Sequence, residues 1–189
     1  MAQAVALVEQ GVGLELTGTE HVPLLEKLVE WLPEADRAGD GLELTRKALE
    51  AHPGDAAFQA LRARSLEQAG AADLAEVESL YRSALEEKPD LLVALLGLAH
   101  LRSTRAGGVE EAIELYRRAV DLEGESDDRA ERALAALLQA EGRREEAIEL
   151  LESLLRKLPW DAEAALLLAE AHLEQADGES LARSRSLLQ

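Results

Sequence analysis

Residues 109–124 read VEEAIELYRRAVDLEG, and residues 144–159, which begin 35 positions later, read REEAIELLESLLRKLP. The two stretches share the run Glu-Glu-Ala-Ile-Glu-Leu, and the same spacing of 35 to 37 positions recurs in four columns along the chain. The columns are Gly41, Val77, Ala112, Ala147 and Ser184; Leu44, Leu80, Leu115, Leu150 and Leu187; Thr45, Tyr81, Tyr116, Leu151 and Leu188; and Ala48, Ala84, Ala119 and Leu154. Repetition at such a period is typical of repeat proteins.

Each repeat predicts one amphipathic helix. Within a unit the columns lie three, four and seven positions apart, so they form a single apolar stripe along a helix. A helix breaker follows the stripe in the first four units, at Pro53, Pro89, Gly124 and Pro159. Because one amphipathic helix cannot bury its stripe alone, the units must stack.

The composition favours an all-α protein. Apolar residues make up 47% of the 189 residues and aromatic residues only 3%, so the packing depends on Leu, Ala and Val. Ala and Leu are strong helix formers, and the content of residues that strands prefer is low. The length fits one globular domain or one short solenoid, and the repeat favours the solenoid.

A second helix precedes the stripe in each unit, so we expect helix pairs. The expected pairs are 19–31 with 40–51, 55–69 with 73–87, 91–105 with 109–122, 128–141 with 144–157, and 162–176 with 179–189. Small residues follow leucine in Leu98-Ala99, Leu134-Ala135 and Leu168-Ala169, and Ala112 and Ala147 lie on the second helices. Helices approach closely where such small side chains cross, so we expect Ala112 and Ala147 to be buried.

Turn and capping residues mark the ends of these helices. Gly107 and Gly142 lie in turns within pairs, where glycine takes the left-handed conformation that ends a helix. Asp55 and Asp161 are expected N-caps, because their side chains accept hydrogen bonds from the first backbone N–H groups. In the first pair we expect Thr19 to cap a helix whose stripe is Leu24, Leu25, Leu28 and Leu32 and which ends or kinks at Pro33.

The charge limits the classes of partner. The chain has 38 Asp and Glu against 20 Lys and Arg, a formal net charge of -18, which repels nucleic acid and anionic membranes. A protein with a basic or apolar surface is the expected partner. No segment is long and apolar enough to span a membrane and no signal peptide is evident, so we expect a cytoplasmic protein.

No catalytic residue, metal site or cofactor is predicted. The chain has no cysteine, which excludes disulfides, thiolate metal ligands and cysteine nucleophiles. Phosphate-binding loops, serine-hydrolase elbows and paired-histidine zinc motifs are also absent from the sequence. His21, His52, His100 and His172 are widely separated, and acidic pairs such as Glu110-Glu111 lie at helix starts, where the helix dipole favours them. We therefore expect a protein that is not an enzyme.

The units resemble tetratricopeptide repeats. Residues 92–124 match in Glu111-Ala112-Ile113-Glu114-Leu115-Tyr116 and Ala119, and residues 128–159 match in Leu134-Ala135, Gly142, Ala147, Leu151 and Pro159. The resemblance implies a right-handed α-solenoid of antiparallel helix pairs over residues 20–189. Its units would be 20–53, 54–89, 90–124, 125–159 and an incomplete 160–189, after an N-terminal arm or cap at 1–19.

The resemblance also implies a protein-protein interaction scaffold, whose first helices line a concave face that holds a peptide or helix of a partner. By position, this groove would be lined by Val93, Leu96, His100, Arg129, Arg132, Ala136, Gln139, Leu166, Glu170 and Leu173, with Ala56, Gln59, Ala63, Leu66, Ser103 and Glu163 at matching places. Arg129 and Arg132 would either receive an acidic ligand group or pair with neighbouring acids. Alternatively, the chain is a recruiting or regulatory module of a larger enzyme whose catalytic part lies elsewhere, or it self-associates through its C-terminal edge.

Overall fold

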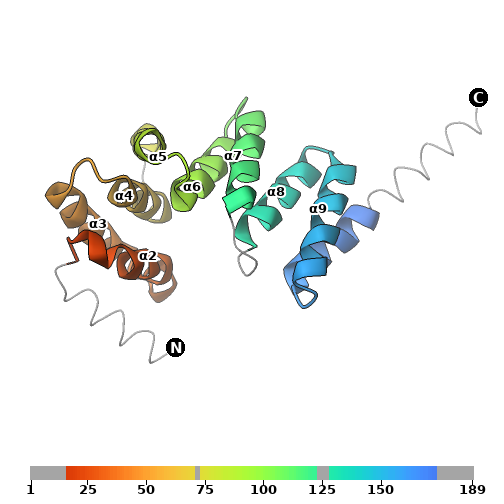
Figure 1. Cartoon of the computed structure of the whole chain (residues 1–189), viewed down its shortest axis with the longest axis horizontal. Helices are drawn as coiled ribbons and strands as arrows, with labels where there is room; N and C mark the ends of the chain where they lie inside the picture. Colours follow the sequence, from red (N-terminus) through yellow and green to blue (C-terminus); the bar gives the residue numbers. More distant parts are fainter. Residues whose placement is uncertain (1–15, 71–72, 123–127, 174–189) are drawn as a thin grey trace, which may run out of the picture. The chain divides into compact units, whose positions relative to one another are not determined.

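The computed structural model describes residues 16–70, 73–122 and 128–173, and these residues form helices joined by short turns, with no strand among them (Figure 1). The elements are η1 (Thr19–His21), α2 (Val22–Trp31), η2 (Pro33–Ala35), α3 (Ala38–Ala51), α4 (Ala56–Gln68), α5 (Leu74–Glu87), α6 (Leu92–Ser103), α7 (Val109–Leu122), α8 (Arg129–Ala140) and α9 (Arg144–Lys157). A further helix is described over residues 162–173. The expected all-α helical repeat is confirmed.

The chain forms two compact units that divide between Leu101 and Arg102, within α6. In the first unit, α4 packs against α2, α3 and α5. In the second unit, α8 packs against α7 and α9. Helices that follow one another after a short turn pack as antiparallel neighbours, which agrees with the predicted helix pairs.

The repeating columns form the core of both units. In the described residues, the columns that begin at Gly41, Thr45 and Ala48 are buried at every position. Ala112 and Ala147 have no exposed surface, which confirms the prediction for these two small residues. The column that begins at Leu44 lies at the edge of the stripe and alternates between buried and half-buried side chains.

Helix ends follow the local signals in the sequence. From α3 to α9, every boundary lies within two residues of the prediction. Asp55 accepts hydrogen bonds from the backbone N–H groups of Ala57 and Phe58, as expected of an N-cap, and Asp73 caps α5 in the same way. Gly107 and Gly142 have φ angles of 75° and 74°, which confirms the left-handed turns within pairs.

The first pair departs from the prediction at its start. Thr19 opens η1 instead of capping a helix, and α2 begins at Val22 without a side-chain cap. Leu24 is 42% exposed, whereas Val29 is buried with Leu25, Leu28 and Leu32. The buried stripe therefore runs through positions spaced by three and four from Leu25, and Leu24 lies one position outside it.

The Tyr81 side chain on α5 packs directly against Gly97 on α6. The Tyr81 ring is fully buried, and a Cβ added at Gly97 would overlap its Cζ, Oη and Cε1 atoms. The Tyr81 hydroxyl donates a hydrogen bond to Glu67 Oε2 at 3.0 Å. Burial, together with the Glu67 carboxylate, raises the pKa of Tyr81 above its ordinary value, so the ring remains a neutral packing group, as its place in a core column predicts.

Candidate functional site

The predicted binding face in the second unit lies on α8 and on the helix at residues 162–173. Arg129, Arg132, Ala136 and Gln139 follow one another along α8 at helical spacing, so they share one face. The next helix begins after Asp161, whose Oδ1 accepts hydrogen bonds from the backbone N–H groups of Glu163 and Ala164, each at 3.0 Å. This confirms Asp161 as an N-cap.

Two residues of this face connect α8 to the next helix. Arg132 binds Glu163 through Nη1 at 2.5 Å and Asp128 through Nη2 at 2.8 Å. Gln139 Nε2 donates a hydrogen bond to the backbone oxygen of Leu167 at 3.1 Å. The guanidinium of Arg132 therefore has carboxylate partners within the chain, which is the ion-paired alternative that the sequence left open.

The carboxyl groups of Asp128 and Asp161 both lie beside Arg132. Burial and a hydrogen bond with Asp161 raise the pKa of Asp128 above its ordinary value. Burial alone would raise the pKa of Asp161 as well. The hydrogen bond from the backbone N–H of Ala164, a hydrogen bond with the Asp128 side chain and the positive charge of Arg132 together outweigh burial and hold the pKa of Asp161 below its ordinary value. Asp161 is thus the more acidic member of the pair, and it lies at the start of a helix, where the dipole favours an anion.

The helix at residues 162–173 presents two large apolar side chains to solvent. Leu166 is 60% exposed and Leu173 is 68% exposed. They lie seven residues apart, which is two helical turns, so they project from the same side of the helix. Glu170 is exposed between them, and Ala136 on α8 is exposed as well.

In the first unit, fewer of the residues predicted to line the binding groove are exposed than expected. Ala56 and Ala63 are buried, so these two positions belong to the core rather than to an exposed face. The reason is that α4 packs on several neighbours and has apolar residues around most of its circumference. Val93 on α6 packs against the core cluster of this unit, Leu96 is half-buried, and His100 is exposed with its Nε2 3.9 Å from a Glu67 carboxylate oxygen.

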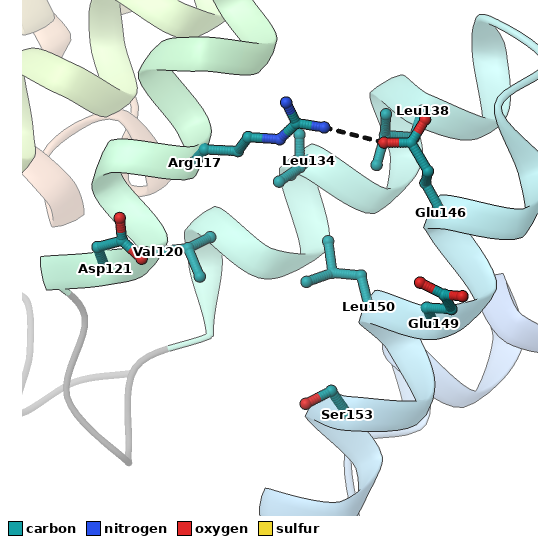
Figure 2. Close-up of a pocket in the computed structure, with 9 residues that line it drawn as sticks. All are labelled: Arg117, Val120, Asp121, Leu134, Leu138, Glu146, Glu149, Leu150 and Ser153. Carbon is teal, nitrogen blue, oxygen red and sulfur yellow. Dashed lines mark hydrogen bonds and ion pairs between the residues drawn. The ribbon is translucent and has the colours of Figure 1, made fainter.

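The second helices form a cleft that the sequence reasoning missed. The cleft has a volume of about 490 Å³ and is lined by residues of α7, α8 and α9, whose side chains Figure 2 shows. Its lining residues are Arg117, Val120 and Asp121 on α7, Leu134 and Leu138 on α8, and Glu146, Glu149, Leu150 and Ser153 on α9. In the sequence, the lining residues of α7 and those of α9 are each spaced by three and four positions, which places each group on one face of its helix. That spacing also fits a core stripe, so sequence alone does not separate the two.

The described residues contain no group of three His, Asp or Glu side chains placed to hold a metal ion. Within the same ranges, none of the helices has the length and apolar character needed to cross a membrane.

Part of the chain matches a known sequence family, and solved structures share its fold. The sequence profile described as tetratricopeptide repeat matches residues 138–180. No curated protein sequence matches the chain.

Solved structures share the fold at low sequence identity. PilF of Pseudomonas aeruginosa aligns over 84% of this chain and 70% of its own, with 19% identity and a TM-score of 0.70. TTC0263, a thermophilic TPR protein of Thermus thermophilus, aligns over 90% of this chain and 99% of its own, with 19% identity and a TM-score of 0.64. The APC/C hetero-tetramer Cut9-Hcn1 aligns over 79% of this chain at 17% identity, with a TM-score of 0.68, and this chain spans only 28% of the matched one.

Proposed function

We propose that this chain, which matches the tetratricopeptide repeat profile at residues 138–180 and shares the fold of a solved TPR protein, is a non-catalytic scaffold that binds a partner protein. In our proposal the partner contributes a peptide or helix, and the face formed by α8 and residues 162–173 receives it. We call this surface the first-helix face and define it by Arg129, Arg132, Ala136, Gln139, Leu166, Glu170 and Leu173.

The observation that carries the proposal is the exposure of Leu166 and Leu173. Both are large aliphatic side chains with more than half of their surface in water. Burying them under a ligand would gain about 25 cal/mol for each Å² of apolar surface removed from water. Two anchors spaced by two turns match an amphipathic helix or an extended peptide with apolar side chains at a similar separation.

The charges on this face favour a ligand with basic rather than acidic flanks. Glu163 and Glu170 are exposed beside the leucines, and the chain carries a net charge of -18. Arg132 already binds Asp128 and Glu163, so an acidic ligand group would have to displace a carboxylate of the chain. We therefore propose that Arg132 positions the helix at residues 162–173, and that apolar anchors supply most of the binding energy.

A capture experiment with matched variants tests this proposal. The full chain is immobilised beside a Leu166→Glu/Leu173→Glu variant and a Leu74→Glu control, which adds charge at an exposed leucine of the first unit. Proteins of the source cell that bind the parent and the control, but not the double variant, would be ligands of the first-helix face. If all three proteins capture the same partners, the first-helix face is not the binding surface.

A further inference from the structure

We propose that the cleft between α7 and α9 is a second docking site, which takes a basic segment of another protein with aliphatic anchors. We call it the second-helix cleft and define it by the lining residues given above. It uses no residue of the first-helix face, so the two sites can be tested separately.

The floor and walls of the second-helix cleft are apolar. Leu134 and Leu138 on α8 are buried at its base, and half-buried Val120 and Leu150 flank them from α7 and α9 (Figure 2). A cleft of about 490 Å³ is within the range of surfaces that hold bound ligands, from about 300 to 1,000 Å³. The apolar part of the cleft therefore suits one or two aliphatic side chains.

The rim of the cleft is acidic. Arg117 is the basic residue among those that line it, and its Nη2 lies 2.9 Å from Glu146 Oε2. Glu146 also binds Arg143, and the hydrogen bond from Arg143, with the charges of both arginines, lowers the pKa of Glu146. This local cluster is neutralised within the chain, so the charge that remains at the rim comes from Asp121 and Glu149.

Asp121 and Glu149 define the chemistry of the occupant. Both carboxylates are exposed, they come from opposite walls of the cleft, and neither forms an ion pair with any residue that the structure describes. A Lys or Arg of a partner would meet a carboxylate on either side while its neighbouring aliphatic residue enters the cleft. The lining residues on α9 extend from Glu146 to Ser153, about 10 Å along the helix axis, which is the length of two helical turns of a ligand.

A peptide titration tests the chemistry of the second-helix cleft. The probe is a fluorescein-labelled 12-residue amphipathic peptide of leucine and lysine, followed by fluorescence anisotropy with the full-length chain. The test variant is Asp121→Lys/Glu149→Lys. Its matched control is Glu114→Lys/Glu152→Lys, which makes the same charge change at exposed positions of α7 and α9 that do not line the cleft.

The control separates docking from general attraction between a cationic peptide and an acidic protein. We expect the cleft variant to weaken binding by about tenfold and the control by less than about twofold, because only the cleft variant removes short-range partners. Replacing the peptide leucines by serine should abolish binding, since the apolar floor would then remain unfilled.

Two results would overturn the proposal. One is an equal loss of affinity in the cleft variant and its control, which would mean that the peptide responds only to net charge. The other is a loss on Leu166→Glu with none in the cleft variant, which would place the peptide on the first-helix face. Conversely, unchanged binding in Leu166→Glu, together with the loss in the cleft variant, would support the second-helix cleft whether or not the first-helix face binds a partner.

Discussion

Replacing Gly97 by alanine tests the contact between the Tyr81 side chain and the backbone of α6 within the first unit. The three heavy atoms nearest to an added Cβ all belong to the side chain of Tyr81. That ring is fully buried and its hydroxyl is bound to Glu67, so moving the ring would disturb the core or break this hydrogen bond. The new methyl group must therefore displace either the ring or the helix.

Two opposing effects set the size of the change. Alanine in a helix interior is more favourable than glycine by about 1 kcal/mol, because glycine loses more backbone entropy on folding. Overpacking a filled site costs about 1 to 3 kcal/mol. We therefore expect Gly97→Ala to lower the free energy of unfolding by up to about 2 kcal/mol, although the same change on an exposed helix face would raise it.

A Tyr81→Leu background separates the two effects. Without the ring the overlap disappears, so Gly97→Ala should then stabilise the protein by about 1 kcal/mol. The coupling free energy between the two substitutions should be about 1 to 3 kcal/mol. Urea unfolding of the parent, both single variants and the double variant, followed by far-UV circular dichroism, measures it. Additive effects of the two substitutions would refute the proposed contact.

Three further predictions concern the second unit. Ala147→Leu should lower the free energy of unfolding by about 1 to 3 kcal/mol because Ala147 is fully buried, whereas Ala136→Leu on an exposed face should not; thermal melts compare them. Lys157→Met should lower the free energy of unfolding by about 1 to 2 kcal/mol, because Lys157 Nζ lies 2.5 Å from Glu131, which is only 3% exposed and would be left buried without its partner. In urea titrations, Arg156→Met should have little effect, and adding Glu131→Leu to Lys157→Met should restore stability. Asp161 has a lowered pKa, so its contribution to stability is present near neutral pH and is lost as the pH falls below about 4; Asp161→Asn should flatten that part of the pH-stability curve.

The sequence predicted less of the binding site than of the fold. The resemblance to tetratricopeptide repeats named helix positions, and Leu166 and Leu173 are exposed where the resemblance places ligand contacts. Positional matching did not show that Ala63 is buried under neighbouring helices or that Arg132 is bound by Asp128 and Glu163. These outcomes depend on residues from other helices, which a position within one repeat does not specify.

Local physical chemistry in the sequence determined the helices. Periodicity of the apolar columns, breakers such as Pro53 and Pro159, and caps such as Asp55 act within a few residues of chain, so they can be interpreted without knowledge of the partner helix.

Tertiary packing decided which side chains those helices cover. It buried Val29 rather than Leu24 at the edge of the first stripe, and it left Leu150 half-buried in a cleft although its column resembles core. The physical reason is that a stripe of a given width can be covered fully or only partly by the next helix, and the width covered depends on the approach of that helix rather than on the stripe itself.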